Sequence, residues 1–137
     1  MVQSQEHWLK IGAVARLAEV SVDTVRYYER RGVLGPADRL PSGYRLYPET
    51  AVATIRLARR MQSLGMTLDE VADALAAHDR GNATCQSERW RLEAVLARTR
   101  ARLADLATVQ ANLETVLARC DSGRCDLRSP RRPDPAT

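Results

Sequence analysis

Aromatic residues and lysine are scarce in this chain. Aromatic residues make up 4% of it, phenylalanine is absent, and Lys10 is the only lysine. A hydrophobic core must therefore be built from Leu, Val, Ile and Ala, which suits helices that pack against one another or against a second subunit. No apolar run approaches the ~20 residues that a membrane-spanning helix needs, and the N-terminus lacks the apolar stretch of a signal peptide. We therefore expect a cytoplasmic protein with no membrane partner.

The sequence also lacks the residue groupings of enzyme active sites. Its 137 residues correspond to one domain. They contain no nucleophile–base pair, no glycine-rich phosphate loop and no pair of carboxylates suited to a cleft. We predict that the protein is not an enzyme. A structural adaptor that dimerises and binds no DNA stays open as another non-enzymatic reading.

Positive charge is distributed unevenly along the chain. The net charge is +4; residues 1–60 carry ten basic and six acidic side chains, whereas residues 61–137 carry eleven of each. The excess in the N-terminal part indicates a nucleic-acid partner there, although a solvated basic surface would give the same count. Nearly all the basic residues are arginines, which suit bidentate contacts to phosphates and bases.

In the N-terminal part of the chain, the sequence predicts short helices separated by turns. The apolar residues of Ile11–Ala18 have helical spacing, and Ser21 is suited to cap a second helix that ends near Arg31. The tight turn at residues 18–20 between two short helices is typical of a helix-turn-helix. The turn at residues 41–43, between short Leu and Tyr segments, predicts a small hairpin.

Two more helices and then one long helix are predicted to follow. Pro48 suits the first position of a third helix, and Thr67 with Glu70 forms a capping box for a fourth. From about residue 87 to 119, leucines recur at alternating spacings of four and three, the pattern of a coiled-coil seam. Such a stripe needs a partner helix, and its own copy is the simplest one, unless the stripe packs on the preceding helices. The seam positions are Leu92, Leu96, Thr99, Leu103, Leu106, Gln110, Leu113 and Leu117.

The predicted fold class is mainly α, in three regions. Residues 8–80 form an N-terminal winged helix-turn-helix, and residues 81–120 form a long C-terminal dimerisation helix. Residues 121–137 form a loop and a proline-rich tail that we expect to be extended and mobile. Trp90 lies outside the seam, so we expect it to contact the first region.

Candidate DNA contacts lie on both parts of the predicted winged helix-turn-helix. Arginine can bridge guanine acceptors in the major groove, and tyrosine hydroxyls donate to phosphates. Tyr47 is either part of this surface or packs the hairpin onto the helices; the sequence leaves both open. The candidates are Thr24, Arg26 and Tyr27 on the second helix, Arg39, Tyr44 and Arg45 on the hairpin, and Arg16 near the first helix.

Several motifs in this order resemble the MerR family of transcription regulators. The resemblance runs from about residue 10 to 75, and the long helix follows where the family has one. Glu19 departs from the family, which usually has glycine in the helix-turn-helix turn, so we expect mild backbone strain there. The motifs are Ile11–Ala15, Thr24–Glu29, Gly32–Leu34, Gly43–Tyr47 and Leu64–Val71.

The resemblance implies a winged helix-turn-helix homodimer joined by an antiparallel coiled coil. It also implies a mechanism. Members of the family bind double-stranded promoter DNA with an overlong spacer and, with effector bound, bend and untwist it so that RNA polymerase can read both promoter elements. This uses the deformability of DNA rather than new base contacts.

Three cysteines mark the two ends of the long helix. Cys85 precedes it, Cys120 ends it, and Cys125 follows. Thirty-five helical residues span roughly 50 Å at ~1.5 Å per residue, so Cys85 and Cys120 of one chain cannot meet. With antiparallel pairing, however, Cys85 of one subunit lies beside Cys120 and Cys125 of the other, and each dimer has two such sites.

Three thiolates favour thiophilic divalent ions over hard cations. The set resembles the metal-sensing branch of the family, and most closely its mercury sensors. Mercury(II) is therefore the favoured effector, with cadmium, lead and zinc as alternatives, while the loop between Cys120 and Cys125 is shorter than in those branches. The runner-up is a thiol redox sensor on the same scaffold, triggered by an intersubunit Cys85–Cys120 disulfide.

Overall fold

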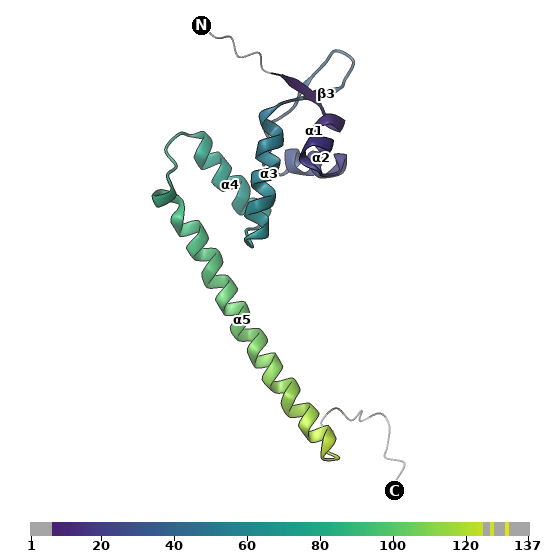
Figure 1. Ribbon diagram of the computed structural model, residues 1–137, viewed down its shortest axis with the longest axis vertical. Coiled ribbons are helices and arrows are strands. Elements are labelled where there is room, and N and C mark those ends of the chain that lie inside the picture. The colour runs from purple at the N-terminus through teal and green to yellow at the C-terminus, as the bar shows by residue number, and fades with distance from the viewer. Residues whose placement is uncertain (1–6, 125–126, 128–130, 132–137) are drawn as a thin grey trace. The chain divides into compact units, whose positions relative to one another are not determined.

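The computed structural model describes residues 7–124, 127 and 131, and it divides into two units, residues 1–95 and 96–137. The predicted mobile tail lies almost wholly outside the described residues. None of the helices described is long and apolar enough to cross a membrane. The mainly helical fold is confirmed (Figure 1), with the elements β1 Trp8–Lys10, α1 Ile11–Ala18, α2 Val22–Arg30, β2 Asp38–Arg39, β3 Arg45–Pro48, α3 Thr50–Ser63, α4 Leu68–Asp79 and α5 Cys85–Asp121.

The helix-turn-helix forms where the capping residues predict it. The Ser21 hydroxyl accepts a hydrogen bond from the backbone N–H of Thr24 at 3.1 Å, which satisfies one of the open donors at the start of α2. Glu19 ends α1 with φ of 58°. Side chains other than glycine adopt this left-handed conformation only at a cost. The expected strain at Glu19 is confirmed.

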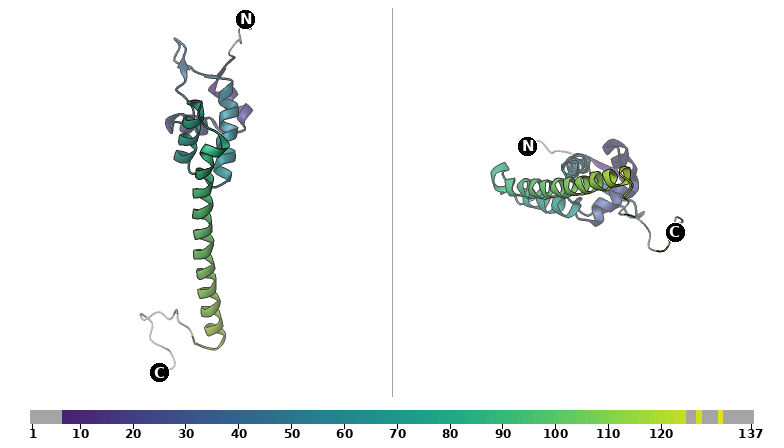
Figure 2. Two further views of the ribbon diagram at one scale, coloured as in Figure 1. Left: turned by 90° about the vertical axis from the view of Figure 1, so that its left-hand side faces the viewer. Right: turned by 90° about the horizontal axis from the view of Figure 1, so that it is seen from below.

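A small aliphatic core holds the N-terminal unit together. Val14 of α1, Val25 of α2, Ile55 of α3 and Val71 of α4 are each fully buried. Helices α1 and α3 lie side by side, with the strands next to α1 (Figures 1 and 2). Val25 thus brings α2 into a core shared with α1, α3 and α4. The largest fully buried side chain is nevertheless aromatic, Tyr47 of β3, so the expected core of Leu, Val, Ile and Ala is confirmed only in part.

A three-stranded antiparallel sheet extends the predicted hairpin. Its order is β1-β3-β2, with Leu9 opposite Tyr47 and Arg39 opposite Arg45. Strand β1 was not predicted from the sequence, because three residues are too few for a visible alternation. It ties the hairpin to the residue just before α1.

Helix α3 begins later than the sequence suggests. Pro48 was expected at its first helical position, but Pro48 ends β3 opposite Trp8, and α3 starts at Thr50. Proline tolerates the end of a strand because its missing N–H is not needed there. The capping box of α4 is confirmed: Glu70 N–H donates to the Thr67 hydroxyl at 3.2 Å, and Thr67 N–H donates to the Glu70 carboxylate at 2.8 Å.

Helix α5 is longer than predicted at both ends. Thr84 and Ser87 exchange hydrogen bonds between side chain and backbone N–H at 2.9 and 3.0 Å, which starts the helix at Cys85 rather than near Ser87. After α5, Gly123 takes a φ of 80° and donates to the Cys120 carbonyl. The expectation for Trp90 was wrong: its side chain is 57% exposed. The Arg91 guanidinium lies 4.5 Å from the centre of its ring.

Candidate DNA interface and cysteine positions

Helix α2 has one buried and one exposed face. Val25 and Tyr28 are buried, whereas Arg26 and Tyr27 are exposed and Thr24 is half-buried. This division follows the helical period, since residues three apart share a face. The structure therefore brings Arg26 and Tyr27 to the surface as predicted, whereas the Thr24 hydroxyl lies 2.8 Å from the Ser21 hydroxyl at the helix cap.

Two arginines flank the exposed ring of Tyr27. The guanidinium carbons of Arg30 and Arg31 lie 5.9 and 6.0 Å from its centre, at the outer limit of cation–π contact. Arg31 also pairs with Asp69 at the start of α4. The exposed end of α2 is thus strongly basic.

The hairpin of β2 and β3, which we call the wing, carries the other predicted contacts. Arg39 and Tyr44 are exposed, and Arg45 is half-buried. The Lys10 ammonium lies 5.1 Å from the centre of the Tyr44 ring. The only lysine of the chain is therefore part of this surface, a position that the sequence alone did not single out.

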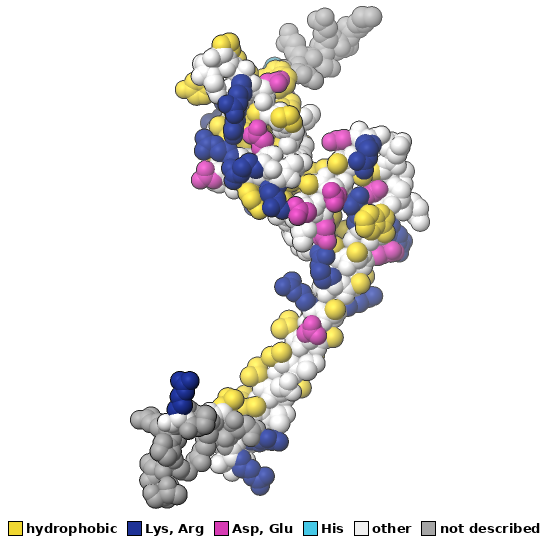
Figure 3. Space-filling view, turned by 180° about the vertical axis from the view of Figure 1, so that it is seen from behind, with side chains coloured by type: hydrophobic (Ala, Val, Ile, Leu, Met, Phe, Trp, Pro, Cys, Tyr) yellow, Lys and Arg dark blue, Asp and Glu magenta, His cyan; other side chains and the backbone are white. Residues whose placement is uncertain are grey.

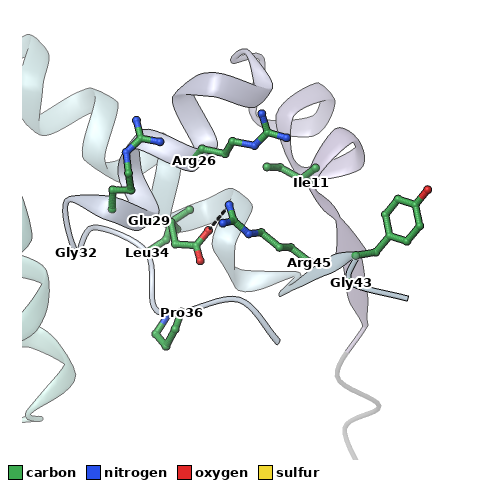
Figure 4. Close-up of a pocket in the computed structure, with 10 residues that line it drawn as sticks. Ile11, Arg26, Glu29, Gly32, Leu34, Pro36, Gly43 and Arg45 are labelled. Atoms are coloured by element: carbon green, nitrogen blue, oxygen red, sulfur yellow. Dashed lines mark hydrogen bonds and ion pairs between the residues drawn. The ribbon is translucent and has the colours of Figure 1, made fainter. Parts of the chain in front are cut away.

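A groove of about 760 Å³ separates α2 from the wing. Figure 4 shows Arg45 reaching from the wing to Glu29 of α2 within this groove, with Arg26 at its side. Lys and Arg side chains also gather on one face of the N-terminal unit in the space-filling view (Figure 3). The groove and its basic rim have the charge that a phosphate backbone attracts.

The carboxylate of Glu29 lies at the centre of the groove. It accepts hydrogen bonds from the Tyr47 hydroxyl at 2.6 Å, the Ala37 backbone N–H at 3.3 Å and the Arg45 guanidinium at 3.4 Å. Burial alone would raise the pKa of Glu29. The hydrogen bonds from Tyr47 and Ala37 and the charges of Arg45 and Arg39 outweigh burial, so the pKa lies below its ordinary value.

Tyr47 belongs to the core rather than to the exposed surface. Its side chain is 1% exposed. Burial and the hydrogen bond to Glu29 raise the pKa of Tyr47 to about 12. Of the two roles that the sequence left open for Tyr47, packing of the wing onto the helices is the one observed.

Arginines of α3 support the helix-turn-helix from behind. Arg56 donates to the carbonyl of Leu17 at 2.7 Å, and Arg59 donates to the carbonyl of Glu19 at 3.5 Å. Both carbonyls belong to the C-terminal end of α1, where positive charge is favourable. Arg16, the predicted phosphate contact, is exposed in the last turn of α1. Sequence reasoning missed Arg56 and Arg59, because their acceptors are backbone atoms about 40 residues away.

Cys85 and Cys120 are both exposed. Cys85 is the first residue of α5 and has a free thiol at the edge of a largely apolar pocket of about 360 Å³. Cys120 precedes the last residue of α5, and Cys125 lies outside the described residues. Within the described part of a single chain, no three His, Cys, Asp or Glu side chains form a group that could hold a metal ion.

Comparison with known proteins identifies the family. Residues 9–78 match the family described as MerR HTH family regulatory protein, and residues 52–116 match the family described as MerR, DNA binding. The chain belongs to the MerR family. It is therefore a DNA-binding regulator of transcription and not an enzyme.

Relatives and a solved structure agree with this family. The chain is 34% identical over 122 residues to the mercuric resistance operon regulatory protein of Pseudomonas fluorescens, covering 89% of this chain and 83% of the relative. It is 31% identical over 112 residues to the HTH-type transcriptional regulator ZntR of Escherichia coli, covering 81% and 79%. A crystal structure of the transcription regulator PbrR691 from Ralstonia metallidurans in complex with lead(II) superposes with a TM-score of 0.75 and 29% identity, covering 90% of this chain and 93% of that one.

Proposed function

We propose that this MerR-family protein is a homodimeric, metal-responsive regulator of transcription. In this proposal it binds double-stranded promoter DNA through α2 and the wing, and a thiophilic divalent ion is its effector. The ion is held by Cys85 of one subunit and by Cys120 and Cys125 of the other. The single observation that carries the proposal is the placement of exposed cysteines at both ends of α5.

The DNA-binding part rests on the exposed basic face around the groove. Arg26 and Tyr27 are proposed to read the major groove from α2, with Thr24 supporting the helix start. Arg39, Tyr44 and Arg45 of the wing and Arg16 of α1 are proposed to contact phosphates. All of these proposed DNA contacts lie on the N-terminal unit, which carries the excess of positive charge.

The dimer is proposed because α5 carries an apolar stripe that no element among the described residues covers. Leu96, Leu103, Leu106, Leu113 and Leu117 of this stripe are all about half-exposed or more. In the space-filling view, apolar side chains follow α5 along its length (Figure 3). A second copy of α5 would cover the stripe, since it offers a complementary seam.

The proposed metal site defines a register for an antiparallel dimer. Extended by its own alternation of four and three, the seam reaches Cys85 at one end and Cys120 at the other. If Cys85 of one subunit faces Cys120 of the other, each pair of facing residues has numbers that add to 205. Leu92 of one subunit then faces Leu113 of the other, and Thr99 faces Leu106. This register follows from the proposed metal site and not from apolar contact alone, because it also puts Leu103 opposite Arg102 and Leu117 opposite Glu88. A parallel dimer would separate the two cysteines by the length of the helix.

The donor set fits a soft ion. Thiolates bind mercury(II), cadmium, lead and zinc in preference to hard cations. Mercury(II) is our first choice, and it is supported by the similarity to a mercuric resistance regulator. The similarity to a regulator crystallised with lead(II) keeps lead open. Bound in this way, the ion would crosslink the two subunits and so bias their relative orientation.

The proposed consequence is a change in promoter DNA. With the effector bound, the dimer bends and untwists the spacer so that RNA polymerase engages both promoter elements, which uses the deformability of DNA. Because the metal site and the DNA contacts involve different residues, the two activities are separable by mutation.

Two measurements test the proposal. Reduced protein is titrated with mercury(II) while the thiolate-to-metal absorption band is followed, and transcription from its own promoter is measured in vitro. We expect one ion for each Cys85–Cys120–Cys125 site. Cys120→Ser should abolish metal-induced transcription and leave promoter affinity nearly intact, whereas Ser122→Ala, two residues away, should change neither.

The redox alternative gives different results in the same assays. It predicts no stoichiometric metal binding, together with oxidant-induced transcription and an intersubunit disulfide between Cys85 and Cys120. If Cys120→Ser abolishes DNA binding as well as induction, the proposed division of roles between α2 and α5 is wrong.

A further inference from the structure

Glu29 is an acidic residue on the otherwise basic surface of the candidate DNA interface. It stands on α2 next to Arg30 and three residues after Arg26, and it lines the groove that faces the wing. A carboxylate there repels phosphate. Its side chain is only 18% exposed, so its contacts, rather than solvent, account for its position.

The carboxylate of Glu29 contacts strand β3 of the wing and the residue just before strand β2. Oxygen Oε1 accepts from the backbone N–H of Ala37, just before β2, and Oε2 accepts from the side chains of Arg45 and Tyr47 in β3. Strands β2 and β3 pair through only two residue pairs, and so short a hairpin is marginal by itself. One side chain of α2 therefore holds the base of the wing on both sides; Figure 4 shows its contact with Arg45.

We propose that Glu29 is a positioning residue that fixes the wing relative to α2, so that Arg45 and Arg26 engage the same DNA duplex together. The inference rests on the proposed DNA interface and adds to it a residue that touches no DNA. A wing fixed before binding costs less conformational entropy when the complex forms. Glu29 accepts from one nitrogen of Arg45, and the Tyr47 hydroxyl lies beside the same guanidinium, so the remaining N–H groups of Arg45 can donate to a phosphate.

A purely electrostatic role and a positioning role of Glu29 predict opposite changes in DNA affinity when its charge is removed. If Glu29 acted on DNA only through its charge, Glu29→Gln would strengthen binding by removing repulsion. If Glu29 positions the wing, the same variant weakens binding, because one amide oxygen and one amide NH₂ cannot accept from three donors. Asp38→Asn is the matched control, since Asp38 is an exposed carboxylate on β2.

The test measures duplex binding against salt concentration for four variants, using a promoter fragment of its own gene and an unrelated duplex. We expect Glu29→Gln to lower affinity about tenfold and to reduce the salt slope by about one phosphate contact. Tyr47→Phe, which changes no charge, should act in the same direction with a smaller effect. Asp38→Asn should leave affinity unchanged or raise it, and Arg45→Ala should reduce the slope as Glu29→Gln does.

Footprinting separates positioning from a loss of folding. Hydroxyl-radical protection by the wing should disappear in Glu29→Gln while protection by α2 stays, which unfolding would not produce. If Glu29→Gln fails to fold, as thermal unfolding would show, Tyr47→Phe carries the same footprinting test. Glu29 is not a positioning residue if Glu29→Gln binds as tightly as Asp38→Asn, or if both Glu29→Gln and Tyr47→Phe keep the protection by the wing. If Arg45→Ala leaves the salt slope unchanged, the proposed DNA interface itself fails, and the role of Glu29 fails with it.

Discussion

The register of the proposed dimer can be tested by crosslinking single cysteines along α5. If Cys85 faces Cys120 of the partner, the two-fold axis crosses the helix between residues 102 and 103. The two copies of Leu103 then lie within about one residue of each other along the axis. The two copies of Leu92, in contrast, lie roughly 30 Å apart, since the axial offset is twice the distance from the centre at ~1.5 Å per residue.

The assay uses a background in which the three native cysteines are replaced by serine. Leu103→Cys should form an intersubunit disulfide rapidly under mild oxidation, seen as a dimer on a non-reducing gel. Leu92→Cys should not, whereas a mixture of Leu92→Cys and Leu113→Cys proteins should crosslink to each other. Ala101→Cys, near the axis but off the seam, is the control and should stay monomeric on the gel. Rapid crosslinking of Leu92→Cys alone would establish a parallel dimer and would rule out the proposed metal site.

Four further predictions concern the N-terminal unit. The pKa of Tyr47 is raised to about 12 from its usual value of 10, so the protonated hydroxyl stabilises the fold below pH 10 and this stability is lost between pH 10 and 12. The denaturant concentration at the unfolding midpoint should therefore fall over that pH range, and it should fall less steeply in Tyr47→Phe. Glu19→Gly should raise the free energy of unfolding by up to about 1 kcal/mol, because relief of the left-handed backbone exceeds the cost of the greater freedom of unfolded glycine; an unchanged or lower value would show that Glu19 is not strained. Ile55→Ala should lower it by roughly 2–5 kcal/mol, because Ile55 is fully buried. Asp69→Ala should reduce metal-induced transcription and change promoter affinity less than twofold, since it frees Arg31, the residue that ends α2, from Asp69 of α4. Full induction in this variant would show that the contact plays no part in regulation.

Local signals made much of the fold predictable. The cap at Ser21 and the capping box of Thr67 and Glu70 each depend on residues three positions apart, so the sequence displays them directly. The strand β1 could not be seen in this way, because Leu9 pairs with Tyr47 across nearly forty residues. Helix α5 starts two residues before the predicted position, because the exchange of hydrogen bonds between Thr84 and Ser87 caps it at Cys85.

In the candidate DNA interface, the exposure of the proposed contacts was predictable from the sequence, whereas the residues that hold them in place were not. Arg26 and Tyr44 were assigned from residue type and helical or hairpin position, and both are exposed. Glu29 lay inside a quoted motif but received no role, because its partners Ala37 and Tyr47 are eight and eighteen residues away. Residue type and spacing in the sequence reveal which side chains can contact a ligand. The side chains that hold these groups in position are recognised only from tertiary contacts.

The contacts within the N-terminal unit connect the region around Cys85 with α2. Cys85 shares a pocket with Met61 of α3 and Ala74 of α4. Helix α2 is in turn attached to both helices, because the Tyr28 hydroxyl donates to Gln62 at 2.7 Å and Arg31 pairs with Asp69. A displacement of the start of α5 against α3 and α4 would therefore act on the two helices that hold α2. Since Glu29 ties the wing to α2, the wing would move with it, and a ligand at Cys85 would then shift the proposed DNA interface without touching any of the residues proposed to contact DNA.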